Sequence, residues 1–235
     1  AYDYYKGVNS GVRLSINGVK RLVDSDINPS RGFKLDVDIT YEKNKFIEGL
    51  DLSDAGTLVP NWANNDLWRM QQSSSLFFAI PTTNRMTISL ESIAGTISNV
   101  EADSFFHFFA GGLNGLKGYP FYSIEGKSIA IATGTLRLPI FREKHIPLSW
   151  FILQNCTLGF IGQIGDAWSQ SIDEPNWLRS VGIQWRINGF SFYNFPTAIG
   201  LELHQGLDTF QRQINNKSVT YGQEQRFYLT ILFGF

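Results

Sequence analysis

The residue types that most often carry chemistry are sparse and scattered in this 235-residue chain. The three histidines, His107, His145 and His204, lie far apart and match no metal-ligand spacing. The single cysteine, Cys156, cannot form an intrachain disulfide or a thiolate metal cluster. The sequence contains no Gly-x-Ser-x-Gly elbow, no His-Glu-x-x-His motif and no phosphate-cradling loop. We therefore expect that the chain is not an enzyme and binds no cofactor or metal.

Glu202 and His204 come closest to a catalytic pair. They occupy alternate positions in a stretch of alternating polar and apolar residues, so in a strand both side chains would face the same side. No motif supplies a third group to orient them, and no matching set of serine, histidine and asparagine is present. We interpret the two residues as the polar lining of one face of a sheet.

Composition narrows the class of protein further. Charged residues make up 17% of the chain, below the roughly 25% of ordinary soluble domains, and aromatic residues make up 14%. A net charge of −1 excludes nucleic-acid binding driven by bulk positive charge. The uncharged stretch Ile146–Gly165 is long enough for a transmembrane helix, but its proline, glycines and polar residues argue against one. The first residues lack a signal peptide, which favours a mature chain or a portion of a longer one.

The elements that would position these residues are strands, because apolar and polar residues alternate along most of the sequence. Several segments reach the ~9–11 residues that a strand needs to cross a bilayer. No segment shows a sustained helical period. The pattern predicts about ten strands, at residues 11–23, 33–46, 67–81, 85–98, 105–112, 127–141, 148–164, 177–189, 197–210 and 222–235.

The connections between the expected strands are alternately short and long. The long ones span residues 47–66, 113–126, 168–176 and 211–219, and the short ones span 82–84, 142–146 and 189–196. This rhythm, with low charge and aromatic residues near strand ends, is typical of an antiparallel transmembrane β-barrel of the outer-membrane type. A soluble sandwich or lipocalin-like barrel remains the alternative, since alternation alone does not say which face turns inward. The aromatic residues concerned are Trp62, Trp68, Phe141, Trp150, Trp168, Trp177 and Tyr221.

The last residues of the chain form an alternating strand that ends in phenylalanine. It resembles the C-terminal signal strand that the assembly machinery of bacterial outer membranes reads. A strand with a free edge and one lipid-facing row can be paired by another sheet edge. The apolar row consists of Phe227, Leu229, Ile231, Phe233 and Phe235.

The loop at 113–126 carries the tetrapeptide Leu116-Lys117-Gly118-Tyr119 and is followed by a strand that contains Arg137-Leu138-Pro139-Ile140. With the turn Asp26–Gly32, these motifs resemble the bacterial surface antigen family, which includes the BamA- and TamA-like outer-membrane assembly factors and the two-partner secretion translocators. The resemblance covers residues 11–235. In that family a hydrophobic-Arg-Gly-aromatic tetrapeptide lies on a long loop folded back into the barrel.

The resemblance also implies how much of the barrel this chain supplies. The family's barrel has sixteen strands, and five strands follow the motif loop, as they do here. Only about five strands are expected before the loop, so residues 1–235 are either the C-terminal barrel portion or an unusually short member of the family, and we favour the C-terminal portion. The missing strands and the POTRA or other N-terminal domain would lie upstream.

This sequence departs from the family at the loop arginine, which is Lys117 here. The family's arginine meets wall carboxylates at positions that align with Thr135 and Gln163. We expect Lys117 to make ordinary hydrogen bonds to these residues, to pair with Asp166 or to extend into lumenal water. The loop would then be held mainly by packing of Leu116 and Tyr119. Thr135, Arg137, Gln163 and Asp166 are the expected wall contacts of the loop.

The function implied by the resemblance is the insertion or translocation of proteins in the outer membrane of a Gram-negative bacterium or a related organelle membrane. Client strands would pair at a lateral seam beside the last strand. The implied partners are outer-membrane lipid, client outer-membrane or secreted proteins, and periplasmic or lipoprotein accessory subunits. The alternative is a passive pore, or a membrane anchor for an attached N-terminal domain such as a patatin-like lipase.

Overall fold

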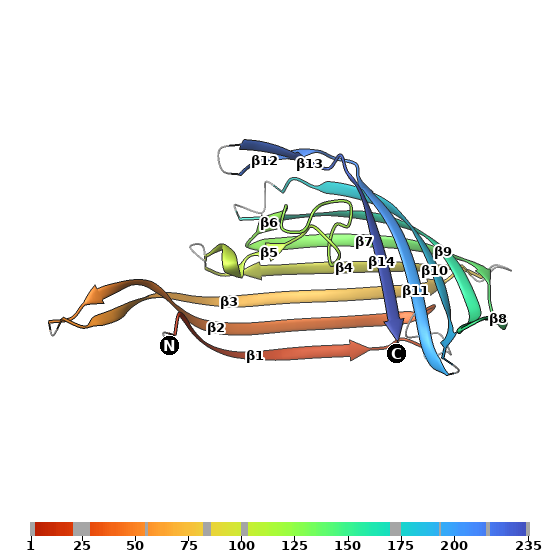
Figure 1. The fold of residues 1–235 in the computed structure, drawn as a ribbon, viewed down its shortest axis with the longest axis horizontal. Helices are drawn as coiled ribbons and strands as arrows, with labels where there is room; N and C mark the ends of the chain where they lie inside the picture. Colours follow the sequence, from red (N-terminus) through yellow and green to blue (C-terminus); the bar gives the residue numbers. More distant parts are fainter. Residues whose placement is uncertain are drawn as a thin grey trace.

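The structure is a computed structural model that describes residues 3–20, 29–54, 56–81, 86–99, 103–169, 175–192, 194–214 and 217–233. Its dominant element is one antiparallel sheet of ten strands (Figure 1). The sheet order is β1-β2-β3-β4-β7-β9-β10-β11-β14, and β8 pairs with one end of β9. The prediction of an all-β, antiparallel fold is therefore confirmed. The strands of this sheet are β1 (Tyr5–Asn17), β2 (Gly32–Leu52), β3 (Leu58–Ala79), β4 (Thr87–Ile97), β7 (Ser128–Phe141), β8 (Ile146–Leu148), β9 (Phe151–Trp168), β10 (Leu178–Ser191), β11 (Phe195–Gly206) and β14 (Gln225–Phe233).

The segment 105–112 does not form the predicted strand of the main sheet. It contains a short 3-10 helix, η1 (Ser104–Phe106), and the two-residue strand β5 (Phe108–Phe109), which pairs with β6 (Glu125–Gly126). Asp103 caps η1 by accepting a hydrogen bond from the backbone N–H of Phe105 at 2.8 Å. Phe106 is buried against Leu67 and Ile97, so the apolar residues that suggested a strand anchor the loop to the sheet instead. Among the described residues, four strands of the main sheet, rather than five, precede the motif loop.

Two expected loops contain strands. Much of the segment 47–66 continues β2 and β3 into a long hairpin, with a register shift between Ile47 and Gly49. At its end the N–H of Ser53 donates to the carbonyl of Thr57 at 2.8 Å. The segment 211–219 contributes to a separate hairpin of β12 (Phe210–Ile214) and β13 (Lys217–Tyr221). Polar residues in both segments suggested loops, but strand pairing satisfies backbone hydrogen bonds whatever the side chains are.

The two faces of the sheet differ sharply in polarity. Trp185, Leu201 and Leu229 lie side by side on β10, β11 and β14, and the Trp185 and Leu229 side chains are 43% and 58% exposed. The next row, on the opposite face, contains Gln184 and Glu202, which are only 4% and 5% exposed. The apolar face extends to the other edge of the sheet, where Val12, Ile39 and Met70 are exposed neighbours. A soluble sheet would bury its apolar face instead.

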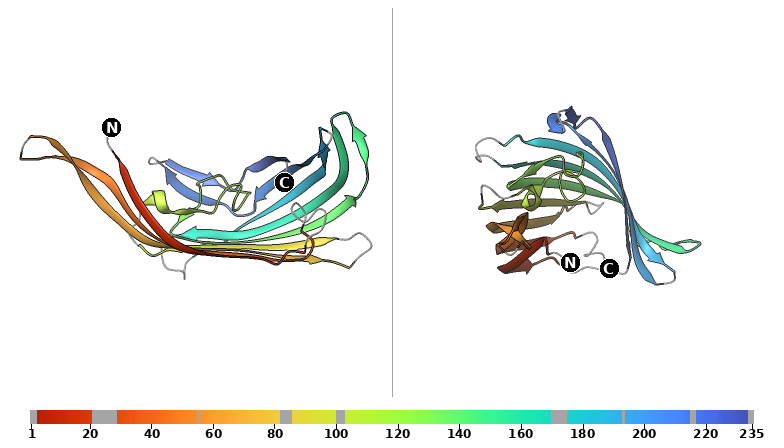
Figure 2. Two further views of the ribbon diagram at one scale, coloured as in Figure 1. Left: turned by 90° about the horizontal axis from the view of Figure 1, so that it is seen from below. Right: turned by 60° about the vertical axis from the view of Figure 1, so that its left-hand side comes forward.

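The sheet is bent, and the connection between β4 and β7 lies on its concave side, together with β12 and β13 (Figure 2). We call this polar, concave side the inner face and the apolar side the outer face. Within the described ranges, β1 and β14 each have one neighbour in the sheet, so the sheet is open at both edges. No helix among the described residues is long and apolar enough to cross a membrane.

Candidate functional site

The motif loop packs tightly against the inner face of the sheet. Leu116 and Tyr119 are both 0% exposed and belong to one apolar cluster. The cluster joins them to loop residues and to inner-face residues of the wall, so burial of apolar surface holds the loop on the sheet. The other members are Ala110, Ile124, Ile129, Ile131, Ala167 and Leu178.

Gly118 lets the loop backbone approach the wall closely. A Cβ atom at this position would lie 2.6 Å from the backbone nitrogen of Gly206 and 2.7 Å from the Cβ of Ser180. Real Cβ atoms essentially never come this close to other heavy atoms, and the backbone of β11 cannot move aside cheaply. Glycine is required at residue 118 because there is no space for a side chain. Gly206 of β11 is similarly restricted, since a Cβ there would lie 2.9 Å from Cζ of Tyr119.

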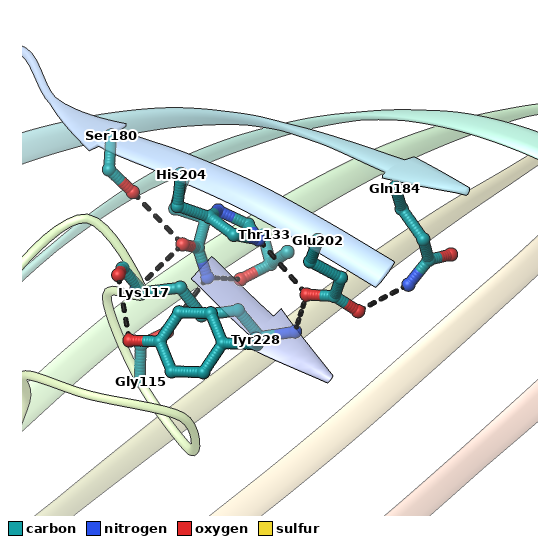
Figure 3. A network of polar contacts seen from close by, with 9 residues as sticks. Gly115, Lys117, Thr133, Ser180, Gln184, Glu202, His204 and Tyr228 are labelled. Carbon is teal, nitrogen blue, oxygen red and sulfur yellow. Dashed lines mark hydrogen bonds and ion pairs between the residues drawn. The ribbon is translucent and has the colours of Figure 1, made fainter. Parts of the chain in front are cut away.

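Lys117 forms a buried ion pair with Glu202 (Figure 3). Its Nζ lies 2.5 Å from Oε2 of Glu202, whose side chain is 6% exposed. The same oxygen is 3.0 Å from Nε2 of His204, and Oε1 accepts a hydrogen bond from Nε2 of Gln184. The loop cation therefore meets a carboxylate after all, but the carboxylate comes from β11. The expected side-chain partners Thr135, Gln163 and Asp166 are not the ones that it contacts.

Gln163 of β9 binds the backbone of the loop. Its Oε1 accepts a hydrogen bond from the N–H of Lys117 at 2.9 Å, and its Nε2 donates to the carbonyl of Gly115 at 2.8 Å. Ser180 and Thr133 fix the amide by hydrogen bonds of 2.9 and 3.2 Å. A neutral amide offers both a donor and an acceptor, whereas a carboxylate would only accept. Glutamine at this position is thus suited to hold a peptide backbone.

Tyr119 connects the loop to the start of β10 and to the segment that follows β11. Its hydroxyl lies 2.9 and 3.0 Å from the carbonyl oxygens of Arg179 and Asp208, and it accepts a hydrogen bond from the N–H of Asp208 at 3.2 Å. Burial raises the pKa of the Tyr119 hydroxyl, so it remains protonated. The Arg179 side chain makes two hydrogen bonds to the Asp208 carboxylate, of 3.0 and 2.7 Å. These contacts fasten the loop to the connection that follows β11.

The other wall residues singled out in the sequence have different roles. Thr135 is buried on β7 and lines the same cavity as Lys117. Arg137 directs its Nη1 to Ser89 of β4 at 3.3 Å. Asp166 accepts hydrogen bonds from the N–H groups of Ala167 and Asn176, at 2.8 and 2.7 Å, and so fastens the chain entering β10. Of the expected wall contacts, Gln163 is the one that binds the loop backbone directly.

The C-terminal strand carries the expected apolar row on the outer face. Phe227, Leu229, Ile231 and Phe233 are all at least 48% exposed, whereas Phe235 lies outside the described residues. On the inner face of β14, the Tyr228 hydroxyl donates to the carbonyl of Lys117 at 2.9 Å. The last strand is therefore bonded to the motif loop, a contact that no sequence pattern indicates.

In the turn motif at Asp26–Gly32, residues 26–28 lie outside the described part of the chain. Gly32 has a φ of +121°, a conformation that L side chains rarely adopt, and it starts β2. The carbonyl of Arg31 accepts a hydrogen bond from the N–H of Lys20 at 2.9 Å.

No known protein family, curated protein or solved structure matches this chain.

Lys117→Ala is expected to destabilise the fold by about 1.5–3 kcal/mol, since it removes a charged hydrogen bond from the buried carboxylate of Glu202. Equilibrium unfolding in detergent measures the change. Lys127→Ala is the matched control, because the contact of Lys127 with β4 is made by its backbone carbonyl to Ile97. Equal stability of Lys117→Ala and Lys127→Ala would show that the ion pair contributes nothing.

The Arg179–Asp208 contact is expected to make stability depend on acid pH. Hydrogen bonds from the Arg179 side chain hold the pKa of Asp208 below its ordinary value. A carboxyl group with a lowered folded-state pKa stabilises the fold above its unfolded pKa, and this contribution is lost as the pH falls through the folded pKa. Asp208→Asn should therefore be less stable than wild type near neutral pH, and the gap should close below about pH 4. A gap that stayed constant through acid pH would contradict this origin. The difference in stability between the two proteins should be no larger than the contribution of an exposed ion pair, because the Arg179 side chain is exposed to solvent.

Proposed function

We propose that this chain forms the wall of an outer-membrane β-barrel that inserts or translocates proteins by pairing client strands at a lateral seam. The observation that carries the proposal is the unpaired edge of β14, which bonds only β11 among the described strands. An edge strand offers a row of N–H and C=O groups to another strand. Within a bilayer these groups have no water to bond, so pairing with a client strand would satisfy them.

The polarity of the sheet supports a membrane location for this edge. Exposed apolar side chains lie on the outer face from β1 to β14, interrupted by Gln72, Ser74 and Ser92 on β3 and β4. The buried polar residues of the strands lie on the inner face. An apolar band outside and a polar interior is the arrangement of transmembrane barrels. A client strand added beside β14 would continue the same alternation.

The motif loop provides a mechanism for controlling the seam. β14 pairs with β11 along residues 225–233. On its inner face, the Tyr228 hydroxyl also donates a hydrogen bond to the carbonyl of Lys117 in the loop. Lys117 is in turn bound to Glu202 of β11. The loop thus joins the last two strands through one lysine, and its displacement would loosen β14 without breaking the rest of the sheet.

Both sheet edges are open, and the loop needs room inside the barrel. The interior width of a barrel increases with the number of strands, and an eight-stranded interior is just wide enough for its own side chains. We propose that these strands belong to a larger barrel, of sixteen strands by the resemblance, in which further strands lie between β1 and β14.

Strand pairing can be tested with a fluorescent peptide that copies residues 225–235. We expect saturable binding to the protein in lipid vesicles, and photo-crosslinks from the peptide to β14 or β1. The control peptide replaces alternate residues with proline, which removes backbone donors and should abolish binding. Equal binding of both peptides, or none, would contradict strand addition. Ion conductance without peptide binding would instead favour the passive pore.

A further inference from the structure

A polar cavity of about 420 Å³ lies on the inner face, beneath the motif loop and between β3 and β11. Its size falls in the ~300–1,000 Å³ range of small-molecule sites. Hydroxyl groups of Ser73, Ser75 and Thr135 line it, and Arg137 and Arg186 project from the wall. The proposed strand exchange uses none of these side chains.

Each of the two arginines has a glycine as its register neighbour on the inner face, and the glycine beside Arg186 leaves room for its guanidinium group. Gly159 of β9 lies beside Arg137 in the register, and Gly200 of β11 lies beside Arg186. A Cβ at Gly200 would come within 3.8 Å of Nε of Arg186, so the guanidinium passes over the space that a side chain would fill. The two arginines are close enough to interact electrostatically across β9. Two like charges on a partly buried wall are unfavourable unless an anion offsets them.

The charges around the cavity are not balanced. Lys117, Arg137 and Arg186 contribute three positive charges, and Glu91 and Glu202 contribute two negative ones. Both oxygens of Glu202 already accept hydrogen bonds, from Lys117, His204 and Gln184. Glu91 and Glu202 both act electrostatically on the two arginines, so two carboxylates face the three cations.

The hydrogen bonds of Arg137 are also incomplete. Its Nη1 contacts Ser89 at the long distance of 3.3 Å, and its buried Nε has no partner. A buried donor without an acceptor is unfavourable, and more so when it is charged. An oxyanion in the cavity would supply the missing acceptor.

We infer that this cavity binds a soluble phosphate-type oxyanion, a phosphate ester or pyrophosphate, between Arg137 and Arg186. Guanidinium groups bind phosphate oxygens in a bidentate manner, and two of them with nearby hydroxyls match a group that has several acceptor oxygens. The site lies on the inner face, opposite the exposed apolar rows, so the phosphate would come from solution and not from a lipid headgroup in the surrounding bilayer.

The test is calorimetric titration of inorganic pyrophosphate into the protein in phosphatidylcholine vesicles, with each variant first checked for folding by heat-modifiable mobility. Arg137→Gln and Arg186→Gln should each weaken binding by about tenfold or more, while lysine at either position should retain part of the affinity. Lys34→Gln, which removes an inner-face charge outside the cavity, should change the affinity by less than about twofold.

Glu91→Gln provides a variant whose effect misfolding cannot imitate. Removing this carboxylate should tighten pyrophosphate binding several-fold, because it repels the anion and competes for the arginines. Absence of saturable binding to the wild-type protein would overturn the proposal, as would folded Arg137→Gln protein with wild-type affinity. Equal losses in Lys34→Gln, or no gain in Glu91→Gln, would show binding by bulk charge and also overturn it. Competition by phosphatidic acid in the vesicles would assign the phosphate to lipid and overturn the soluble source.

Discussion

Gly118→Val is expected to detach the motif loop from the wall and to destabilise the fold by about 3 kcal/mol, the upper end of typical overpacking costs. The reason is geometric: a Cβ at residue 118 would meet the backbone of Gln205 and Gly206 at 2.6–2.7 Å. Displacement of the loop would also remove the bond from the N–H of Lys117 to Gln163 and expose Tyr119.

Hydrogen exchange of a peptide covering residues 113–119 reports the detachment directly, because the Lys117 amide is protected by Gln163 in the intact structure. Gly162→Ala is the matched control: a Cβ at Gly162 of β9 has nothing within 4 Å. We expect this control to exchange and unfold like wild type. If Gly118→Val also did so, the close approach of loop and wall would be wrong.

Leu201→Arg and Ile231→Arg are each expected to cost about 2–4 kcal/mol of stability in a lipid bilayer if these residues lie near its midplane. Both side chains lie in the outer apolar row that β11 and β14 share, where Leu201 neighbours Leu229 and Ile231 neighbours Ile199. A charged group there would have to leave water for lipid. Folding yield in vesicles, read from heat-modifiable mobility, and urea unfolding measure the loss.

The control for these variants is Ser73→Arg, which places the same side chain at an exposed position on the inner face of β3. An arginine there reaches a polar environment and should cost far less. Equal tolerance of arginine on both faces would contradict a membrane-facing outer surface, and with it the proposed function.

The sequence pattern was sufficient to predict most of the strands, because alternation of polar and apolar residues is specific to a strand with two different faces. A period of two sets which residues share a face, and Phe227, Leu229 and Ile231 indeed lie together on the outer face. The pattern failed at residues 105–112, where Phe105 and Phe106 of the short helix pack against each other and against Phe46 of β2. Apolar content alone does not distinguish a strand from a buried loop anchor.

The candidate site was only partly predictable, because a sequence pattern describes local segments and not the contacts between distant ones. The tetrapeptide Leu116–Tyr119 is local, so the sequence identified it. Its principal partner is Glu202, 85 residues away from Lys117. Alternation placed Glu202 and His204 on a polar face, but it could not say that this carboxylate would meet the loop lysine. The aligned positions, Thr135 and Gln163, predicted that the Lys117 side chain would contact β7 and β9, whereas its carboxylate partner lies on β11.

The sequence by itself determined that this chain is built from antiparallel strands with one apolar and one polar face, because that follows from local alternation and tight turns. Only the tertiary structure decided which polar residues meet on the polar face. Register sets Arg137 beside Gly159 and Gln184 beside Glu202, and the folded loop then adds Lys117. The tertiary structure also decided that the apolar face is the exposed one, since alternation is the same whichever way a sheet bends.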